Sequence, residues 1–386
     1  GDVFVVAASG GEARNLTPGI GFSPSWVQWT PDGARLLYCA HDGVSGRVGR
    51  IDVASGALTT LAADVLVGEG HWPRLSATAD GATFAAMRSH PSHPAEIALG
   101  QVVGADGAET VAWRRLTRHN PLAEETWALV PSQRITYAGA DGWEIQALYT
   151  PPLRFAGSGA PPMILVVHGG PSAAHVDDMG GWVTQCLVAA GFAVLRPNPR
   201  GSLGRGVAFA DAVLGDMGGK DFEDLMRGVD EAVARGLADP NRLAIAGWSY
   251  GGFMTAWAVT QTTRFKAAMM GAGISDYHSF HAQTNIQDWD ERFLQATPTE
   301  QPEVYRQRSP ITYARAVTTP TLIIHGEKDP CVPVNQAYAF YHALLAQGVP
   351  VELAVYPREG HGFVERDHVA EWVGRMIGWM ERWLAG

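Results

Sequence analysis

Residues 242–257, RLAIAGWSYGGFMTAW, decide the fold that we predict for this chain. The apolar run 243–246 is typical of a buried strand, and an apolar, helix-like run starts at Phe253. Between them, residues 247–251 form a Gly-x-Ser-x-Gly pattern on a tight strand-to-helix turn. The glycines suit this turn because a Cβ at either position would clash. The pattern predicts a nucleophile elbow that lifts the Ser249 hydroxyl above the edge of a sheet.

Strands and helices alternate along the second part of the sequence, after a predicted hairpin at 133–138 and 143–149. The predicted strands are short apolar runs at 163–167, 192–195, 243–246, 267–270, 321–324 and 351–356. The predicted helices lie at 177–190, 221–235, 253–260, 335–346 and 369–384. Buried strands separated by helices indicate a mainly parallel sheet with helices on both faces. We therefore predict an α/β hydrolase fold, whose active site lies at the carboxyl ends of the strands.

Two polar residues follow the last two predicted strands, where an acid and a base are needed. Asp329 follows the penultimate strand, and His361 stands between two glycines after the last one. The chain order Ser249, Asp329, His361 is that of the α/β hydrolase triad. Glu327 is a rival acid two residues earlier, but the sequence DPCVP makes a rigid turn after Asp329 and favours it. We predict a Ser-Asp-His triad.

These residue types suit acyl transfer. A serine hydroxyl is a weak nucleophile near neutral pH, so a base must take its proton as it attacks. The imidazole of His361 titrates near neutral pH and can take this proton and later donate it to the leaving group. Asp329 would fix the imidazole tautomer and stabilise the imidazolium without taking the proton itself.

An oxyanion hole requires two backbone N–H groups that face the carbonyl oxygen of the substrate. We predict one from Tyr250, the residue after the nucleophile, and the other from the HGGP loop at 168–171. Gly170 is our first choice in that loop, with Gly169 as the alternative, because proline has no N–H. His168 is interpreted as structural, since His361 already fills the role of the base.

The first 118 residues contain a weak internal repeat. The sequence TPDG at 30–33 recurs as TADG at 78–81, and each copy precedes a predicted strand, at 34–40 and 82–88. A period of about 40–50 residues with several short strands is typical of β-propeller blades. The alternative is a run of unrelated hairpins. The recurrence of several turn markers together favours the propeller.

We accordingly divide the chain into a partial β-propeller at 1–118, a linker at 119–132 and a catalytic domain at 133–386. The first part has room for two to three blades, whereas closed propellers have about four to eight. An incomplete propeller leaves open sheet edges. We expect the missing blades to lie outside this sequence or to be supplied by a separate chain.

Composition excludes several classes of function. The net charge of −10, without a basic cluster, argues against a nucleic-acid partner. No apolar stretch reaches the roughly 18 residues that span a bilayer, so we expect no membrane partner. Three widely spaced cysteines argue against a disulfide framework and favour the cytoplasm. The sequence begins at Gly1 without a methionine, so a signal peptide upstream stays open.

The chain resembles the prolyl oligopeptidase family of serine peptidases, above all its acylaminoacyl-peptidase branch. The resemblance covers most of 133–386, and its motifs are HGGP (168–171), NPRGS (198–202), GDMGGKD (215–221), GWSYGGFMT (247–255), RFKAA (264–268) and EGH (359–361). GWSYGG together with HGGP is far more specific than Gly-x-Ser-x-Gly alone. The family also carries an N-terminal propeller, which is complete in its members and limits entry to short peptides.

The resemblance implies a serine exopeptidase or oligopeptidase that needs no cofactor or metal, acts on short peptides and assembles as a homo-oligomer. It implies an apolar pocket for the residue before the cleaved bond, with Trp289, Phe293 and Tyr250 as candidates, although a core role fits the first two equally. Arg200 either binds the substrate or pairs with an acid such as Asp216. Dipeptidyl peptidases of the family hold the free peptide amine with acids in the cap. No convincing equivalent stands in this sequence, since EE at 124–125 lies in the linker.

Two rival functions remain. A carboxylesterase would use the same triad, and a propeller-based binding protein would carry an inactive hydrolase domain. Acylaminoacyl-peptidase-like activity ranks first, ahead of dipeptidyl or carboxy-exopeptidase activity within the same family.

Overall fold

The computed structural model describes residues 1–67, 74–104, 108–179 and 181–384. The chain folds into two compact units. Unit 1 comprises Gly1–Arg134 with Ala174–Gly181 and Ser202–Asp211, and unit 2 comprises Ile135–Ala173, Trp182–Gly201 and Ala212–Gly386. The boundaries at 118 and 133 stay predictions.

Unit 2 is built on an eight-stranded sheet with the order β12-β13-β15-β14-β16-β17-β18-β19. β13 is antiparallel to β15, and the strands from β15 through β14 to β19 are parallel. The strands are β12 (Gln133–Ala138), β13 (Glu144–Thr150), β14 (Met163–Val167), β15 (Ala193–Asn198), β16 (Leu243–Trp248), β17 (Ala267–Gly271), β18 (Thr321–Gly326) and β19 (Val351–Tyr356). The predicted α/β fold is confirmed.

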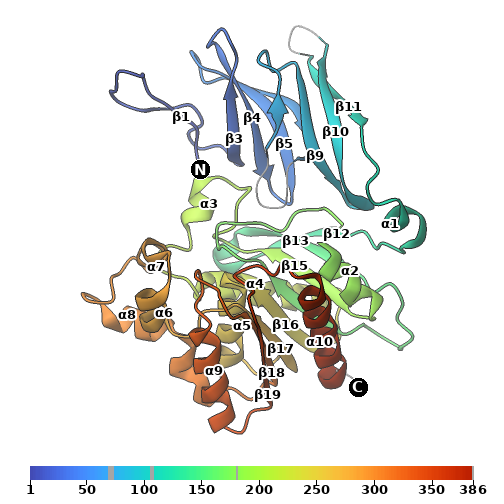
Figure 1. Cartoon of the computed structure of the whole chain (residues 1–386), viewed down its shortest axis with the longest axis vertical. Coiled ribbons are helices and arrows are strands. Elements are labelled where there is room, and N and C mark those ends of the chain that lie inside the picture. Colours follow the sequence, from blue (N-terminus) through green and yellow to red (C-terminus); the bar gives the residue numbers. More distant parts are fainter. Residues whose placement is uncertain (68–73, 105–107, 180, 385–386) are drawn as a thin grey trace. The chain divides into compact units, whose positions relative to one another are not determined.

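Helices cover both faces of this sheet (Figure 1). On one side lie α2 (Gly181–Ala189) and α10 (Arg366–Leu384); on the other lie α4 (Lys220–Ala234), α5 (Tyr250–Gln261) and α9 (Asn335–Ala346). The short helices α6 (Tyr277–Gln283), α7 (Gln287–Leu294) and α8 (Pro302–Arg308) follow β17. Strands β16, β17 and β18 are almost wholly buried, because neighbouring strands and helices enclose them on every side.

One predicted helix begins later than expected. The sequence predicts a helix over 177–190, but α2 begins at Gly181, and Gly180 lies outside the described residues. The Asp177 N–H donates to the Val44 carbonyl at 2.6 Å, and the Asp177 carboxylate pairs with Arg134. The start of the expected helix therefore forms tertiary contacts within unit 1 instead.

Unit 1 consists of antiparallel sheets. One has the order β3-β4-β5-β6, another β11-β10-β9-β7 with β8 beside β9, and β1 pairs with β2. The strands are β1 (Phe4–Val5), β2 (Arg14–Asn15), β3 (Ser23–Trp29), β4 (Arg35–Asp42), β5 (Ser45–Asp52), β6 (Leu58–Ala63), β7 (Leu66–Val67), β8 (Ser76–Ala77), β9 (Thr83–His90), β10 (His93–Val103) and β11 (Thr110–Arg115). The two larger sheets share one apolar core, to which Leu37, Val48 and Phe84 belong.

The internal repeat is confirmed at the level of hydrogen bonds. Thr30 Oγ1 donates to Asp32 Oδ1 at 2.6 Å, and Thr78 Oγ1 donates to Asp80 Oδ1 at the same distance. Each aspartate also accepts the backbone N–H two residues on, at 3.0 Å. The same turn therefore precedes β4 and β9. The sheets of the described residues are open, so the propeller itself is not confirmed.

The segment that the sequence predicts as a linker contains helix α1 (Pro121–Thr126). Its Glu124 pairs with Arg115 and Arg118, and Glu125 pairs with Arg118. These ion pairs tie the segment to the end of β11.

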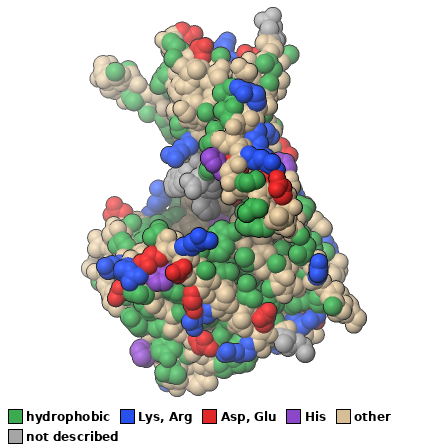
Figure 2. Space-filling view, turned by 45° about the vertical axis from the view of Figure 1, so that its right-hand side comes forward, with side chains coloured by type: hydrophobic (Ala, Val, Ile, Leu, Met, Phe, Trp, Pro, Cys, Tyr) green, Lys and Arg blue, Asp and Glu red, His purple; other side chains and the backbone are tan. Residues whose placement is uncertain are grey.

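Among the described residues, no helix combines the length and apolar character needed to cross a membrane. On the face drawn in Figure 2, basic and acidic side chains are interspersed, and no broad basic patch covers the described residues of that face.

Candidate active site

The predicted elbow lies between β16 and α5. Ser249 has φ 62° and ψ −120°, a conformation that is strained for a residue with a Cβ. A Cβ at Gly247 would collide with the Gly251 carbonyl, and one at Gly251 would collide with the Val167 carbonyl. The two glycines of the motif are thus required by the sharpness of the turn, as the sequence predicts.

The structure brings the three predicted triad residues together. His361 Nε2 lies 2.9 Å from Ser249 Oγ, and His361 Nδ1 lies 2.7 Å from Asp329 Oδ2. The Trp248 indole N–H donates to the His361 carbonyl at 2.8 Å, which joins the elbow to the loop of the base. Glu327, the rival acid, is exposed and accepts the Arg358 N–H instead.

Asp329 is 6% exposed, and donors surround its carboxylate. Oδ1 accepts the N–H groups of Cys331 and Val332, each at 2.9 Å. His325 Nε2 lies 3.5 Å from Oδ2, the oxygen that faces His361. Burial acts to raise the pKa of Asp329, but the hydrogen bonds from His325, His361 and the backbone outweigh it and hold the pKa at about 2. The carboxylate is ionised at neutral pH.

The oxyanion donors that the sequence predicts belong to α5 and to the 168–171 loop. Tyr250 is the first residue of α5, where a backbone N–H has no acceptor within the helix. A Cβ at Gly169 would lie 3.5 Å from Ser249 Cβ, so the 168–171 loop passes beside the serine. Gly170 has φ +119°, and a Cβ there would come within 2.6 Å of the Ser172 nitrogen. His168 is 5% exposed, and its Nδ1 lies 2.6 Å from the Gly169 carbonyl oxygen.

Sequence reasoning missed the acid that holds the Tyr250 side chain. The Tyr250 hydroxyl donates to Asp221 Oδ2 at 2.6 Å, and Asp221 is 1% exposed. Burial raises the pKa of Asp221 to about 6, against hydrogen bonds from Tyr250 and from the Gly218 and Phe222 N–H groups. The signal was available, because Asp221 closes the GDMGGKD motif, but the motif alone does not say what the carboxylate contacts.

Arg200 is 3% exposed and forms a buried ion pair. Its Nε donates to Asp224 Oδ2 at 2.8 Å and its Nη2 to Oδ1 at 3.0 Å. Nη2 also donates to the Ala140 carbonyl at 2.8 Å. Arg200 therefore pairs with Asp224, and its Nη1 also lies 3.3 Å from Asp141 Oδ2. Asp216, the acid that the sequence suggests, instead pairs with Arg308 at 3.0 Å and accepts the Lys220 N–H.

Trp289 and Phe293 lie on α7, where their rings are 5.0 Å apart. A chain of ring contacts connects them to the elbow, through Phe280, Tyr277 and Phe253 to Tyr250. Phe293 is 7% exposed, whereas Trp289 is half-buried. Trp289 is thus the more exposed of the two rings.

Glu359, Glu365 and His368 bring three potential metal-ligand atoms within 4.8 Å of one another. Both Glu359 oxygens already accept backbone N–H groups, so the cluster is hydrogen-bonded within the protein. We assign no metal to it.

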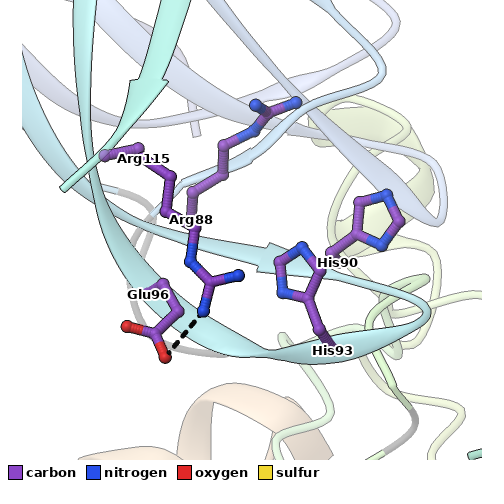
Figure 3. Close-up of a pocket in the computed structure, with 6 residues that line it drawn as sticks. Arg88, His90, His93, Glu96 and Arg115 are labelled. Carbon is purple, nitrogen blue, oxygen red and sulfur yellow. Dashed lines mark ion pairs between the residues drawn. The ribbon is translucent and has the colours of Figure 1, made fainter. Parts of the chain in front are cut away.

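Unit 1 contains a small hollow of its own, shown in Figure 3. It is lined by two arginines, two histidines, one acid and one alanine: Arg88, Arg115, His90, His93, Glu96 and Ala98. Glu96 is 3% exposed and pairs with Arg115 at 3.2 Å. It also accepts from the Thr117 hydroxyl and from the N–H groups of His119 and Asn120. The one acid of the hollow is thus committed to donors of the protein.

Comparison with known proteins identifies the family. The profile of the prolyl oligopeptidase family matches residues 178–386, more than half of the chain. The chain belongs to the prolyl oligopeptidase family. This confirms the resemblance that the motifs predict.

Individual relatives and solved structures are similar to most of this chain. The chain is 37% identical over 313 residues to YuxL, an uncharacterized peptidase of Bacillus subtilis (strain 168), covering 78% of this chain and 45% of that protein. It is 28% identical over 353 residues to the acylamino-acid-releasing enzyme of Sus scrofa, covering 87% of this chain and 47% of the relative. Acylaminoacyl peptidase of Pyrococcus horikoshii superposes with a TM-score of 0.83 at 27% identity, covering 96% of this chain and 57% of that one. The chain spans about half the length of the curated relatives it matches.

Proposed function

We propose that this chain carries the catalytic machinery of a serine peptidase that cleaves short peptides, with acylaminoacyl-peptidase activity as its main function. The observation that carries the proposal is the hydrogen-bonded row Ser249, His361, Asp329, with 2.9 and 2.7 Å between successive groups. It joins a strained serine, a base and an ionised acid at the carboxyl ends of three parallel strands.

The proposed reaction proceeds in two steps. His361 Nε2 takes the proton of Ser249 as Oγ attacks the peptide carbonyl, and Asp329 stabilises the imidazolium. The N–H groups of Gly170 and Tyr250 would stabilise the oxyanion, and the imidazolium then protonates the leaving amine. In the second step water attacks the acyl-enzyme with His361 again as base, which releases the acid product and restores the serine.

Three acids of unit 1, Glu96, Glu124 and Glu125, already have basic or backbone partners. A free ammonium needs an uncommitted carboxylate as its partner. Glu96, which lines the hollow of Figure 3, pairs with Arg115 and accepts the His119 N–H. Glu124 and Glu125 lie on α1 and pair with Arg115 and Arg118. We therefore rank acylaminoacyl-peptidase activity above dipeptidyl-peptidase activity.

For substrate contact we keep Trp289 and Phe293 as proposed members of the apolar pocket. Arg200 is proposed as structural, because its guanidinium is engaged by Asp224 and the Ala140 carbonyl. We further propose that unit 1 is part of a β-propeller, supported by its repeated turn and its two sheets around a common core. The remaining blades would come from outside this sequence or from a separate chain. Homo-oligomer formation and a cytoplasmic location are further proposals.

The test compares two substrate classes with the protein in its native form. We expect an N-acetylated alanine anilide or acetyl-peptide to be cleaved with release of the acylated residue, and a peptide with a free N-terminus to be cleaved far more slowly. Cleavage of short acyl esters without any cleavage of peptides would replace the proposal by a carboxylesterase. Release of dipeptides from free N-termini would replace it by a dipeptidyl peptidase.

A further inference from the structure

The loop that carries His361, residues 357–365 between β19 and α10, is closed by one buried carboxylate. Glu359 is 0% exposed. Its Oε2 accepts the Val364 N–H and its Oε1 accepts the Glu365 N–H, each at 2.9 Å. Since both donors lie beyond His361 in the chain, this side chain bridges the two ends of the segment that holds the base.

A third donor comes from the first turn of α10. His368 Nδ1 lies 2.9 Å from Glu359 Oε1. Burial acts to raise the pKa of Glu359, but the bonds from Val364, Glu365 and His368 outweigh it and bring the pKa below its usual range. Glu359 is therefore an ionised acceptor at neutral pH. The N-terminus of α10 lies beside it and favours its negative charge.

The main chain of the same residue ties this loop to the loop of the acid. The Glu359 carbonyl accepts the N–H of Lys328, the neighbour of Asp329, at 2.8 Å. The contact is so close that a Cβ at Gly326 would collide with the carbonyls of Glu359 and Gly360. Glu359 is thus joined to both sides of the His361–Asp329 hydrogen bond.

We propose that Glu359 is a positioning residue: its buried carboxylate fixes the loop that presents His361 to Ser249 and Asp329. The inference rests on the proposed function. Glu359 touches no reacting atom and acts through the placement of the imidazole. Since a misplacement of about 1 Å can cost about 100-fold in rate, loss of this clamp lowers the rate of the chemical step without weakening substrate binding.

The test is Glu359→Gln in the full chain. An amide places a donor against backbone N–H donors, so at least one of the three hydrogen bonds is lost. We expect kcat to fall about 10- to 100-fold with KM within about twofold of wild type. The rate of Ser249 labelling by a fluorophosphonate should fall by a similar factor, while the final extent stays at one label per chain. A merely structural role would lower the extent instead, because part of the protein would be unfolded.

The matched control is Glu365→Gln on the same loop. Its carboxylate pairs with the exposed Arg358, and its backbone N–H to Glu359 remains. The same carboxylate lies 3.7 Å from His368 Nδ1, whereas Glu359 Oε1 lies 2.9 Å from it, so His368 keeps its nearer partner in this variant. We expect kcat within about twofold of wild type, because surface ion pairs contribute little.

Should Glu359→Gln fail to fold, His368→Ala tests the same clamp. It removes one donor from a partly exposed position, and we expect kcat about 3- to 10-fold lower at unchanged KM. Wild-type kcat and labelling rate in either folded variant would overturn the inference. Failure of the proposed function looks different: wild type would be labelled at Ser249 but cleave no peptide, and the labelling rates would still test Glu359.

Discussion

Asp329 and Asp221 are both buried carboxylates close to the Ser249 elbow, but their pKa values are shifted in opposite directions. Asp329 is surrounded by two histidines and two backbone N–H groups, and its pKa is about 2. Asp221 has a tyrosine hydroxyl and two backbone N–H groups, and burial raises its pKa to about 6. Burial alone therefore does not set the charge of an acid; its donors do. The ionised Asp329 faces His361 and is suited to stabilise the imidazolium that the proposed mechanism forms.

Asp329 reaches Ser249 through His361, and Asp221 contacts the side chain of the neighbouring Tyr250. Ser249→Ala should lower kcat about 10⁶-fold while the protein keeps its fold, because the attacking oxygen is removed. Steady-state kinetics on an acetyl-peptide, with circular dichroism as the folding control, measures this. Turnover near the wild-type level would remove Ser249 from the mechanism.

The two acids of the Asp329 loop can be separated by amide variants. Asp329→Asn should lower kcat about 10⁴-fold, since the neutral amide no longer fixes the imidazole tautomer or stabilises its cation. Glu327→Gln is the matched control and should retain most activity, because Glu327 is exposed and contacts the Arg358 backbone. Equal losses in the two variants would contradict the assignment of the acid.

A substitution of Arg200 tests whether its ion pair with Asp224 contributes to substrate binding or to stability. Arg200→Met leaves the Asp224 carboxylate buried without its cation, so we expect the free energy of unfolding to fall by about 3–5 kcal/mol. KM should stay within about twofold of wild type where the variant is folded. A large rise in KM at unchanged stability would restore Arg200 as a substrate contact.

Asp221 should have the smallest effect on turnover and a distinct pH dependence. Its folded pKa lies above the ordinary value, so its contribution to stability is present at low pH and is lost as the pH rises through about 6. Asp329 has the opposite sign, because its contribution is present at neutral pH and is lost as the pH falls toward 2.

Asp221→Asn removes the ionisable group and should therefore compare more favourably with wild type at pH 8 than at pH 5. Melting temperatures at the two pH values measure this, and kcat should fall less than about tenfold. A difference in melting temperature that is independent of pH would show that Asp221 does not titrate in this range.

Local burial patterns predict the strands of the unit 2 sheet and five of its helices, and β14, β19 and α9 have the predicted bounds. The short helices α6, α7 and α8 were not predicted. The approach of Ser249, His361 and Asp329 was predictable from the rule that strand ends meet at one sheet edge. Contacts between distant segments were not. Asp177 bonds to Val44 and lies outside α2, which begins at Gly181. The partners of Asp221, Arg200 and Glu359 depend on side-chain packing, which a local sequence period does not encode.

The most direct test of the Ser249 active site is the reaction of the native protein with a fluorophosphonate, followed by mass spectrometry of its peptides. We expect one adduct per chain, located on Ser249, and loss of labelling in His361→Ala. Labelling on another residue, or an unlabelled Ser249 in the folded protein, would contradict the claim that the elbow, His361 and Asp329 form a working active site.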